Sequence, residues 1–140
     1  MPSYTHPSDV SNGRRWAGRT LSGIAVLFLL FDSSIKLLNL SVVADSMNQL
    51  GYPVRLAPVI GAIELVCLTV YVVPRTSILG AILLTGYLGG AISTHLRVGD
   101  PLFSHVLFPL NVAALIWGGL YLRDRRVRTL LPLETVPPLR

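Results

Sequence analysis

The sequence is poor in two residue classes on which many soluble proteins depend, cysteine and charged residues. Cys67 is the only cysteine, which excludes an internal disulfide, a CxxC redox pair and a zinc ribbon, since each needs at least two thiols. Charged residues make up 14% of the chain, against about 25% in soluble proteins. Hydrophobic residues make up 51% and gather in long blocks, leaving too few polar residues to cover a soluble domain. We therefore predict that the bilayer surrounds most of this chain.

The sequence also lacks the short motifs of several enzyme classes. It contains no glycine-rich phosphate loop, no serine nucleophile elbow and no H-E-x-x-H zinc motif, so nothing indicates an NTPase or a hydrolase. The net charge of +5 could suggest a nucleic-acid partner. The positions of the basic residues, described below, instead indicate membrane topology, and we expect no nucleic acid to bind.

Four apolar stretches predict membrane-spanning helices. A helix needs about 20 residues to cross a hydrocarbon core about 30 Å thick. Stretches of this length lie at about residues 17–38, 56–74, 76–96 and 103–122. We predict an all-α, four-transmembrane-helix bundle that occupies residues 14–131. The flanking segments are predicted to be a disordered N-terminal tail, 1–13, and a flexible C-terminal tail, 132–140.

Basic residues predict the orientation of the bundle. The positive-inside rule places both termini and the Pro74 turn in the cytoplasm, with the 39–55 and 97–104 loops outside. Only Arg55 and Arg97 lie in the predicted outer loops. The basic residues on the predicted cytoplasmic side are Arg14, Arg15, Arg19, Arg75, Arg123, Arg125, Arg126, Arg128 and Arg140.

The first outer loop contains a weak helical pattern. Val42, Val43, Met47 and Leu50 have near-helical spacing, and the helix-breaking run Gly51-Tyr52-Pro53 follows them. One interpretation is a short amphipathic helix on the outer leaflet. The other is a solvated connector, and the pattern alone does not separate the two.

Beyond the basic flank that ends at Arg19, the ionisable residues inside the predicted spans fall in the outer half of the bundle. Asp32 and Lys36 have the i, i+4 spacing that favours an ion pair. The charge of Glu64 then needs a partner of its own, and the candidates are Lys36, His95 and His105. Alternatively, the Glu64 carboxyl is protonated and neutral. Because charges are costly in hydrocarbon, their grouping predicts either a polar pocket open toward the outer leaflet or a network that only locks the helices together. The predicted ligand-binding residues are Asp32, Lys36, Glu64, Thr94, His95, His105 and Asn111.

His95 and His105 allow a second chemistry. At adjacent outer ends of two spans they could ligate a haem or a metal together with Glu64. Two histidines without a matched second shell are more typical of hydrogen-bonding residues, so we predict no metal site. Cys67, in an apolar setting, is predicted to serve packing.

Small and aromatic residues predict helix contacts. Gly86 and Gly90 form a G-x-x-x-G pair, which lets two helices approach closely, and we expect a contact within the bundle rather than with a second copy. Gly61 and the Gly118-Gly119 pair are expected to serve the same packing. The aromatic residues expected to anchor the helices at the cytoplasmic interface are Trp16, Trp117, Tyr71 and Tyr121.

Several short motifs carry a family resemblance. They are Ile35-Lys36-Leu37-Leu38, Leu50-Gly51-Tyr52-Pro53, Gly61-Ala62-Ile63-Glu64-Leu65, the run from Gly80 to Tyr87, and the run from Gly89 to His95. With them the chain resembles the DoxX-like family of small bacterial four-helix membrane proteins over about residues 17–131. The resemblance implies a multi-pass protein of the bacterial cytoplasmic (inner) membrane. It also implies relatives named for subunits of a thiosulfate to quinone oxidoreductase or linked to membrane redox-stress complexes. It marks Lys36, Glu64, Thr94 and His95 as site positions.

Two functional hypotheses follow. In the first, the pocket binds a small lipophilic molecule, a quinone ahead of a haem, as an accessory to membrane redox chemistry. Lys36 and His95 would donate hydrogen bonds to a carbonyl, and Glu64 would accept or supply a proton. In the second, the chain is a structural or assembly subunit that docks another membrane protein, such as an oxidoreductase, and its charges serve only helix packing. Because the chain has no cysteine pair, we do not expect it to be an enzyme on its own. We expect membrane lipid as a partner, and the sequence is compatible with a homo-oligomer.

Overall fold

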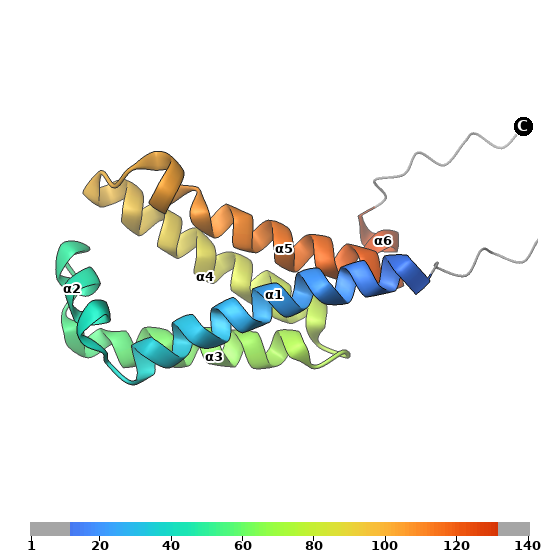
Figure 1. The fold of residues 1–140 in the computed structure, drawn as a ribbon, viewed down its shortest axis with the longest axis horizontal. Helices are drawn as coiled ribbons and strands as arrows, with labels where there is room; N and C mark the ends of the chain where they lie inside the picture. Colours follow the sequence, from blue (N-terminus) through green and yellow to red (C-terminus); the bar gives the residue numbers. More distant parts are fainter. Residues whose placement is uncertain (1–11, 132–140) are drawn as a thin grey trace, which may run out of the picture.

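The computed structural model describes residues 12–131, which form helices and no strand. Four helices run along the molecule (Figure 1): α1 (Asn12–Leu37), α3 (Ala57–Val72), α4 (Ser77–Val98) and α5 (Phe108–Arg123). The shorter elements are α2 (Ser41–Gln49), the 3₁₀ turn η1 (Val54–Leu56), the π-helical turn η2 (Leu102–Val106) and α6 (Arg125–Leu130).

Four stretches are long and apolar enough to cross a membrane: Asn12–Leu37, Val54–Val72, Ser77–Val98 and Leu102–Arg123. The predicted all-α four-helix fold is therefore confirmed, and the chain is a multi-pass membrane protein. Large apolar side chains such as Leu27 (69% exposed) and Val66 (62% exposed) lie on the outer surface of the helices, where they contact membrane lipid.

The helix boundaries differ from the predicted ones near the first and the last described residues. α1 begins at Asn12 rather than at about residue 17, because the polar turn that contains Arg14 and Arg15 continues the helix beyond its apolar stretch. The basic segment after α5 folds as α6. The rest of the predicted tails, 1–11 and 132–140 with Arg140, lies outside the described residues.

Of the two interpretations left open for the first loop, the structure shows the short amphipathic helix, α2. Val43 and Met47 are each 6% exposed and pack against Ala57 at the start of α3, whereas Val42 on the other face is 59% exposed. Figure 1 places α2 across one end of the bundle and α6 at the opposite end. We refer to these as the α2 end and the α6 end.

The long helices touch most closely where they carry glycine. A Cβ on Gly119 of α5 would lie 2.8 Å from the Ser22 nitrogen and 2.9 Å from the Gly18 carbonyl of α1. A Cβ on Gly61 of α3 would lie 2.8 Å from the Lys36 Cβ. The predicted packing roles of Gly61 and Gly119 are thus confirmed, and α1 is the helix that both approach.

Two predictions about helix contacts are wrong. Gly86, Gly89 and Gly90 have nothing within 4 Å of an added Cβ, so they face open space instead of another helix. Tyr71 is not an interface anchor: it is fully buried, and its hydroxyl lies 3.0 Å from the Ser22 Oγ and 3.2 Å from the Ile116 carbonyl oxygen. The G-x-x-x-G spacing and the aromatic residues near the span ends can be read from the sequence. Neither pattern reveals whether those residues face another helix, a cavity or the lipid.

Gly119→Ala is expected to destabilise the bundle by about 1–3 kcal/mol, because the added methyl meets backbone atoms of α1 that cannot move independently. Gly118→Ala is the matched control. Its Cβ would meet only Leu21 Cδ1 at 3.8 Å, an ordinary contact. Thermal unfolding of both variants in detergent checks this, and equal midpoints would contradict the close α1–α5 crossing.

α6 is held against the bundle by a polar contact outside the membrane-spanning segments. The Arg126 guanidinium donates to the carbonyl oxygens of Pro74, at 2.6 Å, and Arg75, at 3.3 Å, in the α3–α4 turn. Asp124 caps α6 by accepting from the Arg126 backbone N–H at 2.9 Å. Val127, 1% exposed, is buried beneath.

The docking of α6 is expected to weaken in acid. Hydrogen bonds from the Arg126 side chain lower the pKa of Asp124 below its ordinary value. A depressed pKa in the folded state means that this stabilisation is complete above the ordinary carboxyl pKa and is lost as the pH falls through the folded-state pKa. Asp124→Ala should remove about 1 kcal/mol of capping. Asp124→Asn should keep the cap but flatten the pH dependence of thermal unfolding; an unchanged acid profile would contradict this assignment.

Candidate functional site

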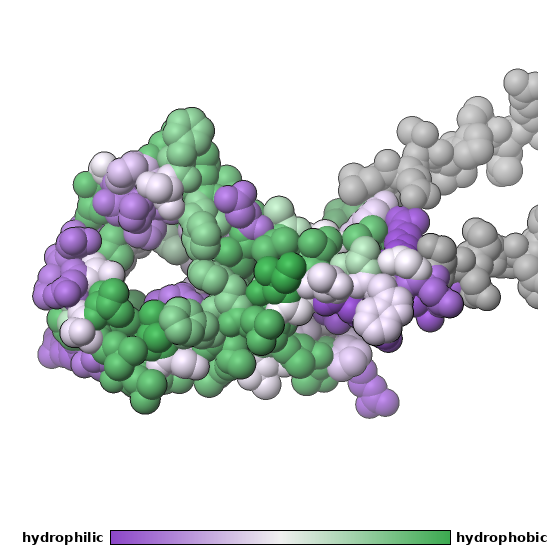
Figure 2. All heavy atoms as spheres, viewed as in Figure 1, coloured by the Kyte–Doolittle hydropathy of each residue, from purple (hydrophilic) through white to green (hydrophobic). Residues whose placement is uncertain are grey.

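A cavity of about 730 Å³ lies between the long helices at the α2 end. The helices converge toward the α6 end and separate toward α2, and Figure 2 shows an opening through the bundle in this region. Every element from α1 to α5 contributes to its wall. Much of the lining is apolar, including Phe28, Leu29, Met47, Ile60, Ile63 and Phe108.

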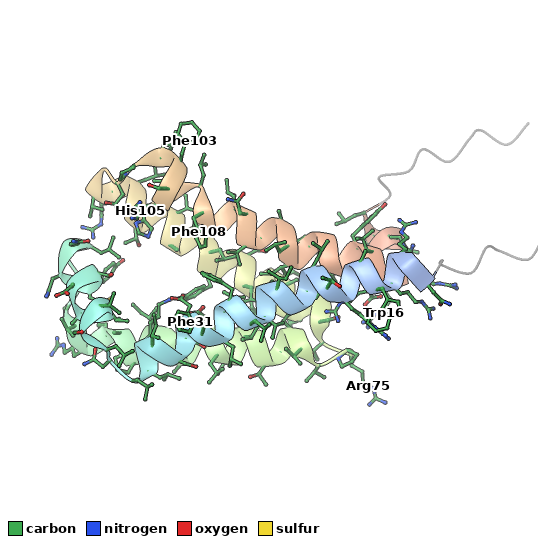
Figure 3. The ribbon with its side chains drawn as sticks, viewed as in Figure 1. Trp16, Phe31, Arg75, Phe103, His105 and Phe108 are labelled. Atoms are coloured by element: carbon green, nitrogen blue, oxygen red, sulfur yellow. The ribbon has the colours of Figure 1, made fainter. Side chains whose placement is uncertain are left out.

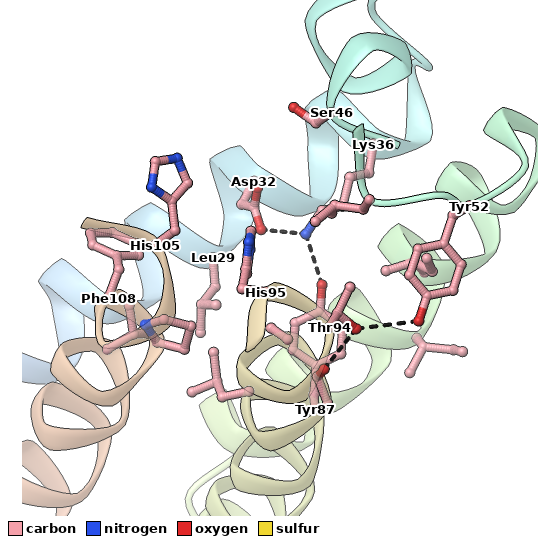
Figure 4. Close-up of a pocket in the computed structure, with 18 of the residues that line it drawn as sticks. Leu29, Asp32, Lys36, Ser46, Tyr52, Tyr87, Thr94, His95, His105 and Phe108 are labelled. Atoms are coloured by element: carbon pink, nitrogen blue, oxygen red, sulfur yellow. Dashed lines mark hydrogen bonds and ion pairs between the residues drawn. The ribbon is translucent and has the colours of Figure 1, made fainter. Parts of the chain in front are cut away.

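Lys36 is the centre of a polar network on the cavity wall. Its Nζ donates to Asp32 Oδ2 at 2.5 Å and to the Tyr87 hydroxyl at 2.7 Å (Figure 4). It also donates to Glu64 Oε2 at 2.9 Å. The predicted Asp32–Lys36 pair is confirmed, and of the proposed partners for Glu64 the structure selects Lys36. An ammonium has three N–H donors, so this network leaves none for a ligand carbonyl. The sequence-based prediction that Lys36 donates to a ligand carbonyl therefore does not fit this network.

Glu64 lies behind this network and does not line the cavity. Its side chain is fully buried, and its Oε2 also accepts from the Tyr87 hydroxyl at 2.8 Å. Oε1 is buried without a hydrogen-bond partner among the described residues. Lys36 and Tyr87 thus supply all the hydrogen bonds that this carboxyl receives from the described chain, which makes it dependent on both.

The two histidines face each other on another part of the wall. Their ring centroids are 5.8 Å apart; His95 Nδ1 lies 2.6 Å from Asp100 Oδ2, and His105 Nδ1 lies 2.7 Å from Ser104 Oγ. Because an ionised carboxylate can only accept, Asp100 holds the hydrogen on His95 Nδ1. The Nε2 of His95 is then the ring nitrogen left for a ligand.

Metal binding finds no support in this geometry. Within residues 12–131, no group of three histidine, cysteine, aspartate or glutamate side chains is placed to hold a metal ion. Glu64, the third ligand that the sequence suggested, bonds to Lys36 and Tyr87 instead. Cys67 is 8% exposed within the apolar core, which confirms its packing role.

The structure brings most of the predicted site residues to one cavity but not all of them. Those that line it are Asp32, Lys36, Thr94, His95 and His105. Glu64 is one layer behind, and Asn111 lies on an exposed part of α5, outside the lining.

Sequence reasoning missed several polar residues of the site. They are Ser46, Tyr52, Tyr87 and Ser104 on the wall and Asp100 behind His95. Tyr87 carried a usable signal: it lies two turns before Thr94, on the same helix face, and sits mid-span rather than at an interface. Tyr52 is brought to the wall by the loop after α2, where its hydroxyl lies 3.2 Å from Thr94 Oγ1.

Comparison with known proteins gives one positive result. A family model described as the DoxX-like family matches residues 20–119. The matched range includes all the cavity-lining residues. No curated protein and no solved structure matches the chain significantly.

Proposed function

The chain belongs to the DoxX-like family, and on that premise we propose that its cavity binds a small lipophilic molecule with a polar head, a quinone, as an accessory to membrane redox chemistry. The observation that carries the proposal is the cavity itself. Its volume of about 730 Å³ falls within the range of about 300–1,000 Å³ typical of small-molecule sites. Its apolar wall with a few convergent polar groups also fits such a ligand.

The polar groups suit a head that carries carbonyl or hydroxyl oxygens. With Nδ1 bonded to Asp100, a neutral His95 presents Nε2 as an acceptor for a hydroquinone hydroxyl, and a protonated His95 presents it as a donor to a quinone carbonyl. The hydroxyls of Tyr52 and Thr94 offer a second polar contact. Phe28 and Phe108, whose rings pack edge to face at 5.2 Å, form one aromatic surface against which a ligand ring would pack.

Charge supports an orientation. The basic residues at the α6 end, among them Arg75, Arg123 and Arg126, favour a cytoplasmic position for that end and an outer position for α2. We propose this orientation, with the cavity in the outer half, for a protein of the bacterial inner membrane, the location that membership of the DoxX-like family suggests. A membrane oxidoreductase would then be the partner that exchanges quinone with it.

The test compares two ligands on the protein in lipid nanodiscs. Isothermal titration calorimetry should find that decylbenzoquinone binds at least about tenfold more tightly than decylbenzene, a difference of about 1.4 kcal/mol that reports head recognition. His95→Leu should reduce this preference, whereas Asn111→Leu, outside the cavity, should keep it. Equal binding of the two ligands, or none, would refute the proposal and favour a structural or docking subunit.

A further inference from the structure

The cavity is closed at the α2 end. Met47 and Leu50 of the α2 region line it, and α2 is anchored on the start of α3 through Val43 and Met47. Arg97 at the end of α4 donates to the Leu50 carbonyl oxygen at 2.5 Å. α2 is thus attached to helices on two sides of the cavity and lies between the cavity and this end of the molecule.

The cavity is also closed toward the α6 end. Leu29, Leu88 and Val112 line it there and are 1%, 6% and 3% exposed, respectively. They belong to the main apolar core, which continues through Leu84 and Ile116. A ligand therefore cannot reach the cavity along the axis of the bundle without displacing core side chains.

The sides of the bundle, unlike its two ends, leave the cavity open. Val59 and Ile63 of α3 line the cavity yet are each 52% exposed, so they stand at an edge between the cavity and the outer surface. On α4, Gly86 and Gly90 also line it, with nothing within 4 Å of an added Cβ. On the opposite side, the η2 turn that precedes Phe108 lies apart from α1 (Figure 3), which agrees with the opening seen in Figure 2.

Because the sides of a membrane-spanning bundle contact lipid, a lateral opening joins the cavity to the bilayer. We propose that the ligand reaches the cavity from within the membrane and is a lipid with a small polar head and a long apolar tail. The head lies near His95 and His105, and the tail leaves between α3 and α4 past Ile63 and Gly90. The identification of the ligand as such a lipid rests on the proposed function. The lateral opening is inferred from the geometry alone and does not rest on it.

Spin-label accessibility tests the opening without any ligand. In a Cys67→Ala background, a nitroxide attached to Gly90→Cys should collide freely with oxygen, which concentrates in lipid. It should collide with a water-soluble nickel complex at least about fivefold less than a label at Asp45→Cys on exposed α2, because the hydrocarbon core holds no water. Gly89→Cys, on the neighbouring open position outside the lining, is the lipid-facing reference. If Gly90→Cys perturbs folding, Ala91→Cys on the same wall replaces it.

The outcomes separate three arrangements. High oxygen and low nickel collision at position 90 supports the proposal. High nickel collision means that the cavity opens to water, and low collision with both means that it is enclosed; either result overturns lateral entry while leaving quinone binding untouched.

Tail length tests the ligand class. At equal concentration in the lipid phase, quinones with decyl and longer isoprenoid tails should bind within about threefold of each other, since the added tail stays in the bilayer. A steep loss with length would overturn a protruding tail, and absence of any quinone binding would refute the proposed function instead.

Discussion

Lys36→Met is expected to lower the free energy of unfolding by about 3–5 kcal/mol, the usual result of removing one partner from a buried ion pair. Glu64 is fully buried and receives hydrogen bonds only from Lys36 and Tyr87 among the described residues. Without the ammonium, the fully buried carboxyl would keep a single hydrogen-bond donor, the Tyr87 hydroxyl. Reversible unfolding in bicelles measures the change.

The matched control is the double variant Lys36→Met/Glu64→Gln. It removes both charges of the pair, so its loss of stability should be smaller than the sum of the two single losses, with a coupling of at least about 1 kcal/mol. Glu64→Gln alone should cost less than Lys36→Met, since Lys36 keeps its pair with Asp32. Additive losses would contradict a direct Lys36–Glu64 interaction.

Gly90→Phe is expected to weaken quinone binding by at least about a hundredfold, or about 2.7 kcal/mol, because the ring would occupy the cavity. Gly90 lines the cavity, and an added Cβ meets nothing within 4 Å, so the new side chain starts from open space.

Gly89→Phe is the control for this change. It makes the same substitution one residue earlier on the same helix, where the Cβ also meets nothing within 4 Å but the position does not line the cavity. Effects on helix propensity are therefore shared by the two variants. Calorimetry in nanodiscs should find wild-type affinity for Gly89→Phe. Equal quinone affinities for Gly90→Phe and Gly89→Phe would show that quinone does not bind in this cavity.

The fold could be predicted because the bilayer simplifies the problem. The length and apolarity of each span determine the helices, and the i, i+4 spacing of Asp32 and Lys36 already places them on one face. The partner of Glu64 needed the structure, because three candidates on different helices were compatible with the same sequence. α2 was left open for a similar reason: Val43 and Met47 indicate a helix only once Ala57 is known to cover them.

The glycines show most clearly where sequence reasoning stops. A G-x-x-x-G pair permits two helices to approach, but an absent side chain equally leaves room for a cavity, and only the positions of neighbouring helices distinguish the two. Gly119 packs against α1, whereas Gly86 and Gly90 form part of the cavity wall. In the same way Tyr71, expected at an interface, bonds to Ser22 in the core.

Mass spectrometry of what the protein carries when extracted gently from its native membrane, with an absorbance spectrum of the same sample, tests ligand binding most directly. We predict a lipid-tailed quinone that remains with wild type and with Gly89→Phe but is lost from Gly90→Phe. Bulk phospholipid alone, in equal amounts for all three proteins, would contradict a ligand-binding cavity.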